Sequence, residues 1–285
     1  MTVKQPAIPW PVKFPFAEAG YEDADIVIVG MPLDRTSSFV PGTRFGPDAA
    51  RIGMGNIETF SPYQKRDVLA LKVHDSGNLE FTYETPETPL ALISEQTRRT
   101  RDSGKRQLAL GGEHTITPAI VRELICGHED LCVIQFDAHS DLRDEYLGET
   151  WCHATAMRRV LKLVPRERLF QVGIRSFAAA SELEEQNLHP FDVLEPVRRV
   201  VGIIGPRPVY LTLDVDVLDP GVLSDVQTPQ PGGCNYRELA SAIAELADLD
   251  VVGCDLVEYA PKGGPAASGA SVVAELVREL VLLLG

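Results

Sequence analysis

The 285-residue chain lacks the sequence features that mark several large classes of protein. Its five cysteines form no C-x-x-C pair, so we expect reduced core cysteines in a cytoplasmic protein. Basic residues are scarce, with 27 Lys and Arg against 41 Asp and Glu, and the net charge of -14 argues against a nucleic-acid partner. The same acidic balance mildly favours a cationic ligand.

Targeting signals and long unbroken apolar runs are also missing. Residues 1–11 contain no basic region followed by an apolar one, so we expect no signal peptide. The apolar tail 272–284 is interrupted by Glu275, Arg278 and Glu279, which predicts a packed helix and no membrane span. Without repeats, low-complexity tracts or a linker, we expect one domain over residues 1–285, with the Pro-rich and aromatic residues 1–23 as an N-terminal arm.

Short, continuous apolar runs alternate along the chain with segments of helical periodicity. We expect strands at 25–31, 69–74, 107–110, 131–136, 169–174, 209–215 and 249–256. We expect helices at 48–57, 88–103, 117–126, 151–163, 178–185, 193–201, 235–246 and 267–284, with Asn235 as an N-cap. Apolar strands that alternate with helices predict a parallel sheet with both faces covered by helices.

Carboxylates and histidines follow four of the predicted strands. Ligands of an open parallel sheet bind beyond the carboxyl ends of its strands, and residues spaced by two on an extended chain project to the same side. The polar residues at these strand ends are His114, Asp137, His139, Asp141, Asp214, Asp216, Asp219 and Glu258.

This cluster of acidic residues predicts a bound cation. Carboxylates raise one another's pKa, so they cannot all lie close together ionised without a counter-charge. Oxygen and imidazole ligands without thiolates favour Mn, with Fe, Co and Zn as alternatives. Six ligand candidates exceed the needs of one ion, so we expect two ions about 3.5–4 Å apart that lower the pKa of a bridging water. The pattern predicts hydrolysis.

Other polar residues have ordinary explanations. His74, His128 and His189 have no partners at ligand spacing, so we expect them at the surface or hydrogen-bonded in the core. Cys152 stands beside His153 and could suggest a thiol nucleophile, but we expect a small packing residue because the metal site already supplies the nucleophile.

Three motifs, in their order and spacing, resemble the metal-binding motifs of the ureohydrolase family, which includes arginase and agmatinase. They are Gly-Gly-Glu-His at 111–114, Asp-Ala-His-Ser-Asp at 137–141 and Leu-Asp-Val-Asp-Val-Leu-Asp-Pro at 213–220. The agmatinase branch in particular is similar at Pro-Gly-Thr-Arg-Phe-Gly-Pro (41–47), at His153 with Arg158 and Arg159, and at Gly-Ile-Arg-Ser (173–176).

The resemblance implies a three-layer α/β/α fold with a mainly parallel sheet of about eight strands and a centre of two Mn²⁺ per subunit. One ion would be held by His114, Asp137, Asp141 and Asp214. The other would be held by His139, Asp137, Asp214 and Asp216, so that Asp137 and Asp214 bridge the two ions. The resemblance further implies a homo-oligomer, a trimer or a hexamer.

The resemblance also assigns roles in catalysis and substrate binding. Asp141 would orient the bridging hydroxide, and His153 would relay a proton to the leaving amine, which suits an imidazole. Glu258 would pair with the guanidinium of a small cationic substrate. Glu258, His153 and Thr228 are therefore the expected substrate contacts.

The implied reaction is hydrolysis of a guanidino compound to urea and an amine, with agmatine giving putrescine as the leading hypothesis. Two stretches depart from the family pattern, Asp-Val-Gln-Thr-Pro at 225–229 and Lys-Gly-Gly at 262–264, and both are expected to line the substrate pocket. The alternatives are therefore the same chemistry on aminopropylagmatine, a guanidino acid or a formimino compound. A catalytically silent metal-binding scaffold is disfavoured by the retained ligands and His153.

Overall fold

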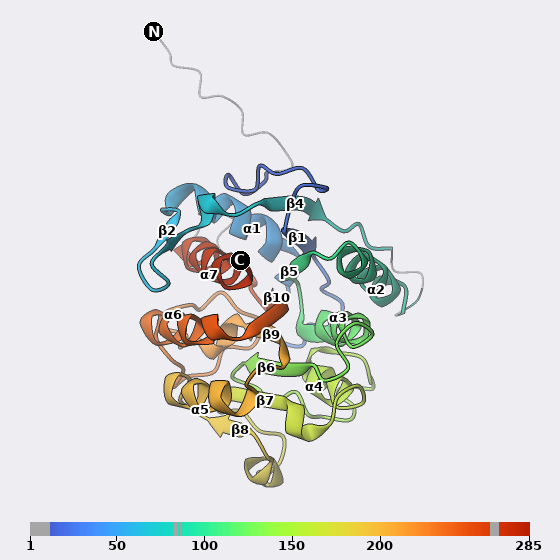
Figure 1. Ribbon diagram of the computed structural model, residues 1–285. Helices are drawn as coiled ribbons and strands as arrows, with labels where there is room; N and C mark the ends of the chain where they lie inside the picture. The colour runs from blue at the N-terminus through green and yellow to red at the C-terminus, as the bar shows by residue number, and fades with distance from the viewer. Residues whose placement is uncertain (1–11, 83–84, 86, 263–267) are drawn as a thin grey trace.

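In the computed structural model, which describes residues 12–82, 85, 87–262 and 268–285, eight strands form one sheet. The strand order is β4-β1-β5-β10-β9-β6-β7-β8, and each neighbouring pair is parallel (Figure 1). The strands are β1 Ile26–Met31, β4 Val73–Asn78, β5 Arg106–Gly111, β6 Cys132–Phe136, β7 Leu169–Ile174, β8 Leu188–Pro190, β9 Pro208–Asp214 and β10 Asp250–Val257. The predicted mainly parallel sheet is confirmed.

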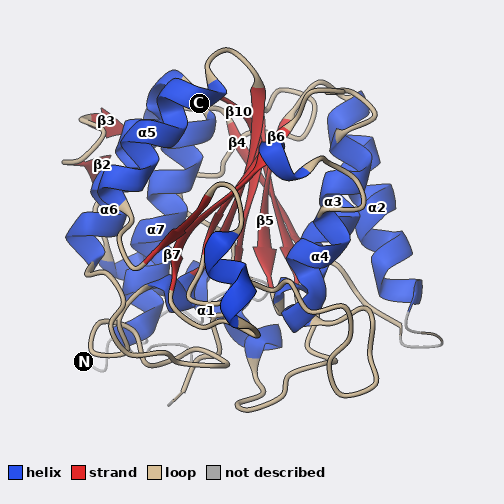
Figure 2. Ribbon diagram, turned by 90° about the horizontal axis from the view of Figure 1, so that it is seen from below, coloured by secondary structure: helices blue, strands red, loops and turns tan. Residues whose placement is uncertain are grey.

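Helices cover both faces of the sheet, as Figure 2 shows. One apolar cluster packs α1 (Gly46–Gly53), α5 (Leu194–Ile204), α6 (Tyr236–Ala244) and α7 (Ser268–Leu284) against one face. A second cluster packs α2 (Glu87–Asp102), α3 (Thr117–Leu124) and α4 (Ala156–Val160) against the other. Alternate side chains of each strand pack into the two apolar clusters, so the strands are buried on both faces. This explains their continuous apolar sequences. The three-layer α/β/α fold is therefore confirmed.

Most predicted elements lie within a few residues of the observed ones, but the edges of the sheet differ. The strand expected at 69–74 was misplaced: Val68–Ala70 is a 3-10 turn, and β4 begins at Val73. β4 is an edge strand, so it is only partly buried and its sequence is largely polar. The apolar residues that suggested a strand lie just before it in the chain. The edge strand β8 and the separate antiparallel hairpin of β2 (Phe60–Ser61) and β3 (Arg66–Asp67) were not predicted, because strands of two or three residues are too short to show a pattern.

Two predicted helices are shorter or tighter than expected. The segment 151–163 contains a 3-10 turn, His153–Thr155, before α4, and the segment 178–185 contains only the 3-10 turn Ala180–Glu184. The expected N-cap at Asn235 is confirmed. Its side chain accepts from the Glu238 backbone N–H, and the Glu238 carboxylate accepts from the Asn235 N–H in return, which is a capping box.

Two predictions concern the ends of the chain, the N-terminal arm and the packed C-terminal helix. Residues 1–11 of the expected N-terminal arm lie outside the described residues, whereas Phe14 and Phe16 are buried in the core. The backbone N–H of Phe14 donates to Asp75 Oδ2 at 3.2 Å. At the other end, α7 is buried along most of its length, as a packed helix should be. No helix in the described part of the chain is long and apolar enough to cross a membrane.

Candidate active site and metal centre

The predicted polar residues lie beyond the carboxyl ends of four strands that are neighbours in the middle of the sheet. In spatial order these strands are β5, β10, β9 and β6. His114 follows β5, Glu258 follows β10, Asp214 ends β9, and Asp137 follows β6. Because parallel strands present the same end to one edge, residues more than a hundred positions apart in the chain converge there.

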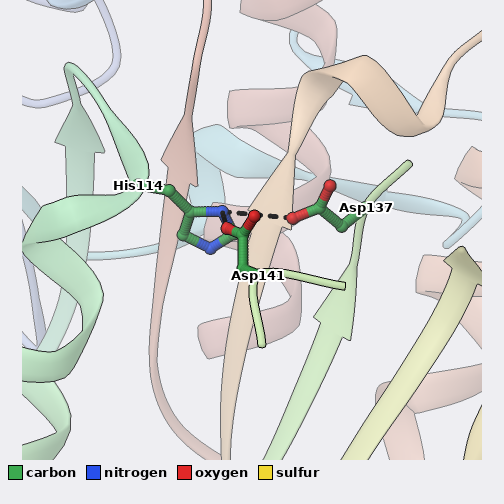
Figure 3. Close-up of side chains that lie close together, drawn as sticks. All are labelled: His114, Asp137 and Asp141. Atoms are coloured by element: carbon green, nitrogen blue, oxygen red, sulfur yellow. Dashed lines mark ion pairs between the residues drawn. The ribbon is translucent and has the colours of Figure 1, made fainter. Parts of the chain in front are cut away.

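His114 is surrounded by three carboxylates. Its Nδ1 lies 3.2 Å from Asp137 Oδ2, 3.2 Å from Asp141 Oδ2 and 3.4 Å from Asp214 Oδ2. Figure 3 shows His114, Asp137 and Asp141 converging on one point. All four side chains are nearly or fully buried. This arrangement brings together donors from three strand ends around a space that a single cation could fill.

A second group lies directly beside the first and shares Asp137 with it. His139 Nδ1 lies 2.9 Å from Asp216 Oδ2 and 3.6 Å from Asp137 Oδ1. Asp137 thus presents Oδ2 to the first group and Oδ1 to the second. The structure therefore brings the six predicted ligand residues together as two adjoining groups.

The hydrogen bonds of His114 show which of its nitrogens is available to a ligand. Thr212 Oγ1 donates its hydrogen to Asp255 Oδ1 at 2.6 Å, so it must accept from His114 Nε2 at 2.8 Å. In the neutral ring Nδ1 then carries a lone pair, and neither it nor Asp216 Oδ2 has a hydrogen-bond partner among the described residues. Buried acceptors that face one another without donors fit a site for metal cations.

The electrostatics of the two groups show the same need for positive charge. Burial raises the pKa of Asp214 well above its ordinary value, and the charges of Asp216 and Asp137 raise it further. Burial, followed by the charge of Asp137, raises the pKa of Asp141 to about 6. Although burial opposes it, the carboxylates of Asp216 and Asp137 raise the pKa of His139 to about 12. Protons are thus drawn into the place that a cation would occupy.

Buried hydroxyl groups and Asp255 support His114 from behind. Asp255 is fully buried in β10 and accepts hydrogen bonds from Tyr210, Thr212 and Thr117 at 2.6–2.7 Å. Burial raises its pKa, and these three hydroxyls oppose that rise. This residue was not predicted, although an aspartate within the otherwise uncharged run 251–256 was a signal for it.

A cavity of about 240 Å³ opens above the two groups. Its lining combines members of both groups with the predicted catalytic and substrate-binding residues. Its lining includes His139, Asp141, Asp214, His153, Glu258, Thr228, Ser38, Arg143 and Tyr146. The structure therefore places Asp141, His153, Glu258 and Thr228 on one cavity, whereas Lys262 does not line it and residues 263–264 lie outside the described residues.

His153 is held between two hydroxyl groups of the loop after β1. Its Nδ1 lies 3.2 Å from Thr36 Oγ1, and its Nε2 lies 3.2 Å from Ser38 Oγ. The ring of Tyr146 packs edge-on against it, with centroids 5.9 Å apart. Burial lowers the pKa of His153 below its ordinary value, which favours the neutral ring near pH 7.

Glu258 is buried and its two carboxylate oxygens are held separately. Oε1 accepts from the His114 backbone N–H at 2.6 Å, and Oε2 accepts from Gln227 Nε2 at 2.7 Å. Burial raises the pKa of Glu258 to about 8. Glu258 and Asp141 adopt left-handed backbone conformations, with φ of 68° and 52°, which are uncommon for residues other than glycine and tend to occur at functional sites.

The loop after β1 and the loop after β5 are joined through their backbones. Gly112 N–H donates to Met31 O at 3.0 Å, and Glu113 N–H donates to Leu33 O at 2.7 Å. A Cβ at Gly112 would lie 1.8 Å from Leu33 O, so only glycine allows this approach. The glycines before His114 thus let the backbone of one loop pass close to the other beside the site.

Sequence reasoning missed several residues that contact the predicted ones. Glu113 and Gln227 belong to stretches that the sequence singles out, 111–114 and 225–229, whereas Thr36 and Ser38 do not. All four make contacts with residues far away in the chain. Ser38 N–H, for example, donates to Gln227 Oε1 at 2.9 Å across 189 positions.

Residues that had been set aside lie outside the two groups. His74 Nδ1 lies 2.9 Å from the Ala19 carbonyl oxygen, and neither His128 nor His189 belongs to a metal-like group within the described chain. Cys152 is buried, and burial raises the pKa of its thiol, which is the state of a packing residue. Asp219 is a loop anchor that accepts from the backbone N–H groups of Gly221, Gly232 and Gly233.

The fold and the site define an α/β enzyme with a histidine–aspartate centre at the carboxyl edge of a parallel sheet. Comparison with known proteins specifies the family. The model of the Arginase family matches residues 24–283, and the chain belongs to that family. It is a hydrolase that acts on guanidino compounds.

Individual relatives are similar over nearly their whole length. The agmatinase of Bacillus anthracis is 38% identical and the agmatinase of Bacillus subtilis strain 168 is 36% identical, each over 92% of this chain and 92% of its own length. The crystal structure of the agmatine ureohydrolase of Thermoplasma volcanium is 30% identical, with a TM-score of 0.84, and the match covers 96% of this chain and 94% of that one.

Proposed function

We propose that this protein is a binuclear manganese hydrolase that converts agmatine to urea and putrescine. The observation that carries the proposal is the pair of donor groups that share Asp137 beneath a cavity also lined by His153 and Glu258. The agmatinases among its relatives support agmatine as the substrate.

The donor atoms fit two cations. One ion would be held by His114, Asp137, Asp141 and Asp214, and the other by His139, Asp137, Asp214 and Asp216. Carboxylate and imidazole donors without a thiolate suit manganese. When bound, such a pair supplies an activated water near neutral pH.

The residues of the chain would perform the remaining steps. Asp141 lines the cavity and would accept a hydrogen bond from the attacking water, which orients it toward the guanidinium carbon. Glu258 is held through one oxygen by His114 and through the other by Gln227, so its position is fixed. A guanidinium cation beside it would favour its ionised form and offer paired N–H donors. His153 would pass a proton to the departing amine.

A second candidate substrate is a guanidino acid, and one side chain of the cavity favours it. Arg143 lines the cavity, packs its guanidinium 5.3 Å from the centroid of the Tyr146 ring, and forms no ion pair with a described residue. A free cation at this position would attract a carboxylate on the substrate tail and would repel the amine of agmatine. Thr228, on the same cavity, would contact either tail.

A substrate panel with manganese-loaded protein separates these proposals. We expect urea and putrescine in equal amounts from agmatine, with a kcat/KM at least about 100-fold above that for 4-guanidinobutyrate. The reverse ranking, abolished by Arg143→Ala, would establish the guanidino acid. Turnover of aminopropylagmatine in preference to agmatine would identify aminopropylagmatine as the substrate. Exclusive release of ammonia would indicate a formimino substrate. No urea from any guanidine would support the silent scaffold and contradict the proposal.

The assembly and location of the protein are part of the same proposal. We propose a single catalytic domain, preceded by an N-terminal arm, that forms a cytoplasmic homo-oligomer, a trimer or a hexamer. Light scattering coupled to size-exclusion chromatography is expected to give a multiple of three times the 31.2 kDa subunit mass. A monomer at micromolar concentration would contradict the expected assembly.

A further inference from the structure

We propose that Glu113 is a positioning residue that acts through the Thr36 hydroxyl and fixes His153 in the Nδ1–H tautomer. This leaves Nε2 free to accept a proton. The inference rests on the proposed function only in that His153 is taken as the proton relay of the reaction. The tautomer itself can be tested without any substrate.

The surroundings of Glu113 define its protonation state. Its side chain is fully buried. Oε2 accepts from the backbone N–H groups of Arg35 at 2.9 Å and Thr36 at 2.6 Å, and Oε1 accepts from the hydroxyls of Thr36 at 2.9 Å and Thr115 at 2.8 Å. Burial raises the pKa of Glu113, and these four donors oppose the rise. With two donor groups placed at each oxygen, we take Glu113 as the carboxylate, which only accepts.

The Thr36 hydroxyl transmits this polarity to His153. A hydroxyl has one hydrogen and two lone pairs. The hydrogen of Thr36 Oγ1 points to Glu113, so both contacts with His153 must be accepted by the oxygen. These contacts are the backbone N–H of His153 at 3.3 Å and its Nδ1 at 3.2 Å. Nδ1 therefore carries a hydrogen, because two lone pairs would otherwise face each other.

The second nitrogen is left unprotonated on the side of the cavity. Burial lowers the pKa of His153, so the ring is taken as neutral, with its single N–H at Nδ1, where Thr36 Oγ1 accepts. Nε2 then accepts from Ser38 Oγ at 3.2 Å. Ser38 lines the cavity together with His153, whereas Thr36 does not. The basic nitrogen is thus the one that faces the substrate space.

This arrangement defines the order of proton transfers. Nε2 receives the proton that the attacking water loses, and the same nitrogen gives it to the leaving amine, while Nδ1 keeps its hydrogen throughout. The negative charge of Glu113, relayed through Thr36, stabilises the ring while it carries both hydrogens, and Glu113 itself receives no proton. Glu113 also precedes His114 in the chain, so one turn positions a candidate metal ligand and the proton relay together.

The tautomer can be read directly by NMR. Protein labelled with ¹⁵N-histidine and loaded with Zn²⁺, a diamagnetic cation, is measured by long-range ¹H–¹⁵N correlation, and His153→Asn assigns its signals among the six histidines. We expect a protonated Nδ1 and an unprotonated Nε2 at pH 7. A protonated Nε2, with or without a protonated Nδ1, would overturn the inference.

Matched variants test the path from Glu113. Thr36→Val removes the hydroxyl at nearly constant volume, and we expect loss of the preference for Nδ1–H together with a kcat lower by roughly ten- to a hundredfold, with KM changed by less than about threefold. Thr36→Ser keeps the hydroxyl and is expected to restore both the tautomer and kcat. A Thr36→Val protein that retains either the Nδ1–H tautomer or the full kcat would contradict the role of this path.

Glu113→Gln gives an opposite signature. The amide introduced by this substitution would offer a donor where Glu113 offers an acceptor, so the Thr36 hydroxyl can turn toward His153 and favour the Nε2–H tautomer. Ser38→Ala is the control, because it removes the Nε2 contact and is expected to keep Nδ1–H. If neither Glu113→Gln nor Thr36→Val alters the spectrum relative to the unmodified protein, the inference fails, even if agmatine is hydrolysed. If no guanidine is hydrolysed but the tautomers behave as expected, only the proposed function fails.

Discussion

Two groups of buried charges in this fold differ in how their negative charge is compensated. Arg51 of α1 and Asp75 of β4 form a bidentate pair with both nitrogen–oxygen distances at 2.8 Å, and both side chains are almost completely buried. Asp75 also accepts from the backbone N–H groups of Phe14 and Gly77. Burial raises the pKa of Asp75, but the hydrogen bonds and charge of Arg51 outweigh it and lower the pKa overall. This group carries its own counter-charge.

In the cluster at the ends of the central strands, no described arginine or lysine forms an ion pair with the carboxylates. Four aspartates surround two histidines, Asp214 has a pKa well above its ordinary value because of burial and its acidic neighbours, and His114 Nδ1 has no hydrogen-bond partner in the described part of the chain. The comparison teaches that burial of charge alone does not identify a functional site. A structural pair is neutral within the protein, whereas a binding site is completed from outside.

The largest expected effect comes from removing a carboxylate that we propose bridges the two ions. In Asp214→Asn, one charge is lost while Oδ1 still accepts from the Asp216 backbone N–H, so the fold should persist. We expect Mn²⁺ affinity to fall by at least about 100-fold and urea production to disappear, as measured by calorimetric titration and a urea assay. Asp219→Asn, which alters a nearby aspartate outside the cluster, should bind Mn²⁺ normally. Full activity in Asp214→Asn would refute the assignment of two metals.

The self-neutral pair should respond in the opposite way. Asp75→Asn leaves Arg51 buried without a counter-charge, so we expect the free energy of unfolding to fall by about 3–5 kcal/mol while Mn²⁺ affinity is unchanged. Urea unfolding followed by circular dichroism measures the first quantity, and calorimetric titration the second.

The pH dependence of the stability lost in Asp75→Asn tests whether the loss comes from the charge of Asp75. Because the folded pKa of Asp75 lies below its ordinary value of 3.8, its contribution is fully present above that value and is lost as the pH falls through the folded pKa. The difference between the unmodified protein and Asp75→Asn should therefore shrink below about pH 4. A constant difference across this range would argue against a charge effect.

Removal of metal should have a moderate effect on stability. Mn²⁺ at 100 times its dissociation constant is expected to add about 2.7 kcal/mol to the free energy of unfolding, and thus to raise Tm by roughly 5–10 °C over chelated protein. Scanning fluorimetry measures the shift. Asp75→Asn should show the same shift from a lower starting point, and Asp214→Asn should show little or none. Equal Tm values for loaded and chelated protein would show that the histidine–aspartate cluster, like the Arg51–Asp75 pair, is stable without an added cation.

The smallest expected effect lies at an exposed position remote from both groups. Asn235→Ala removes the N-cap of α6, and we expect a loss of about 1 kcal/mol, measured by urea unfolding, with no change in Mn²⁺ affinity. Asn235→Asp restores an accepting oxygen and should recover most of the loss. If Asn235→Ala lowers the free energy of unfolding as much as Asp75→Asn does, the buried Arg51–Asp75 pair is no more important for stability than an exposed cap.

The sequence allowed the prediction of those parts of the site that depend on local pattern. Asp137, His139 and Asp141 alternate directly after an apolar strand, and Asp214 and Asp216 repeat the pattern, so their convergence followed from the geometry of a parallel sheet. The order of the strands did not follow. The adjacency of β5, β10, β9 and β6 depends on crossovers that leave no local trace.

The contacts around the predicted residues could not be predicted for a related reason. Thr36 and Ser38 are ordinary loop residues in the sequence, and only tertiary structure brings them to His153, more than a hundred positions away. Gln227 lies in a stretch that was marked as divergent, yet its hydrogen bond to Glu258 depends on how two loops pack. Polar edge strands such as β4 escape a search for apolar runs because the edge of the sheet is only half covered.

The approach of Gly112 to Leu33 has a consequence for how substrate preference can change in this chain. The loop that carries Thr36 and Ser38 shares its backbone hydrogen bonds with the turn that carries Glu113 and His114. Neither segment can be replaced by one of different length without displacing the other. The smallest unit that can be exchanged between relatives is therefore the pair of loops together. Chimaeras that transplant only one of them should lose the proposed metal centre along with the old specificity.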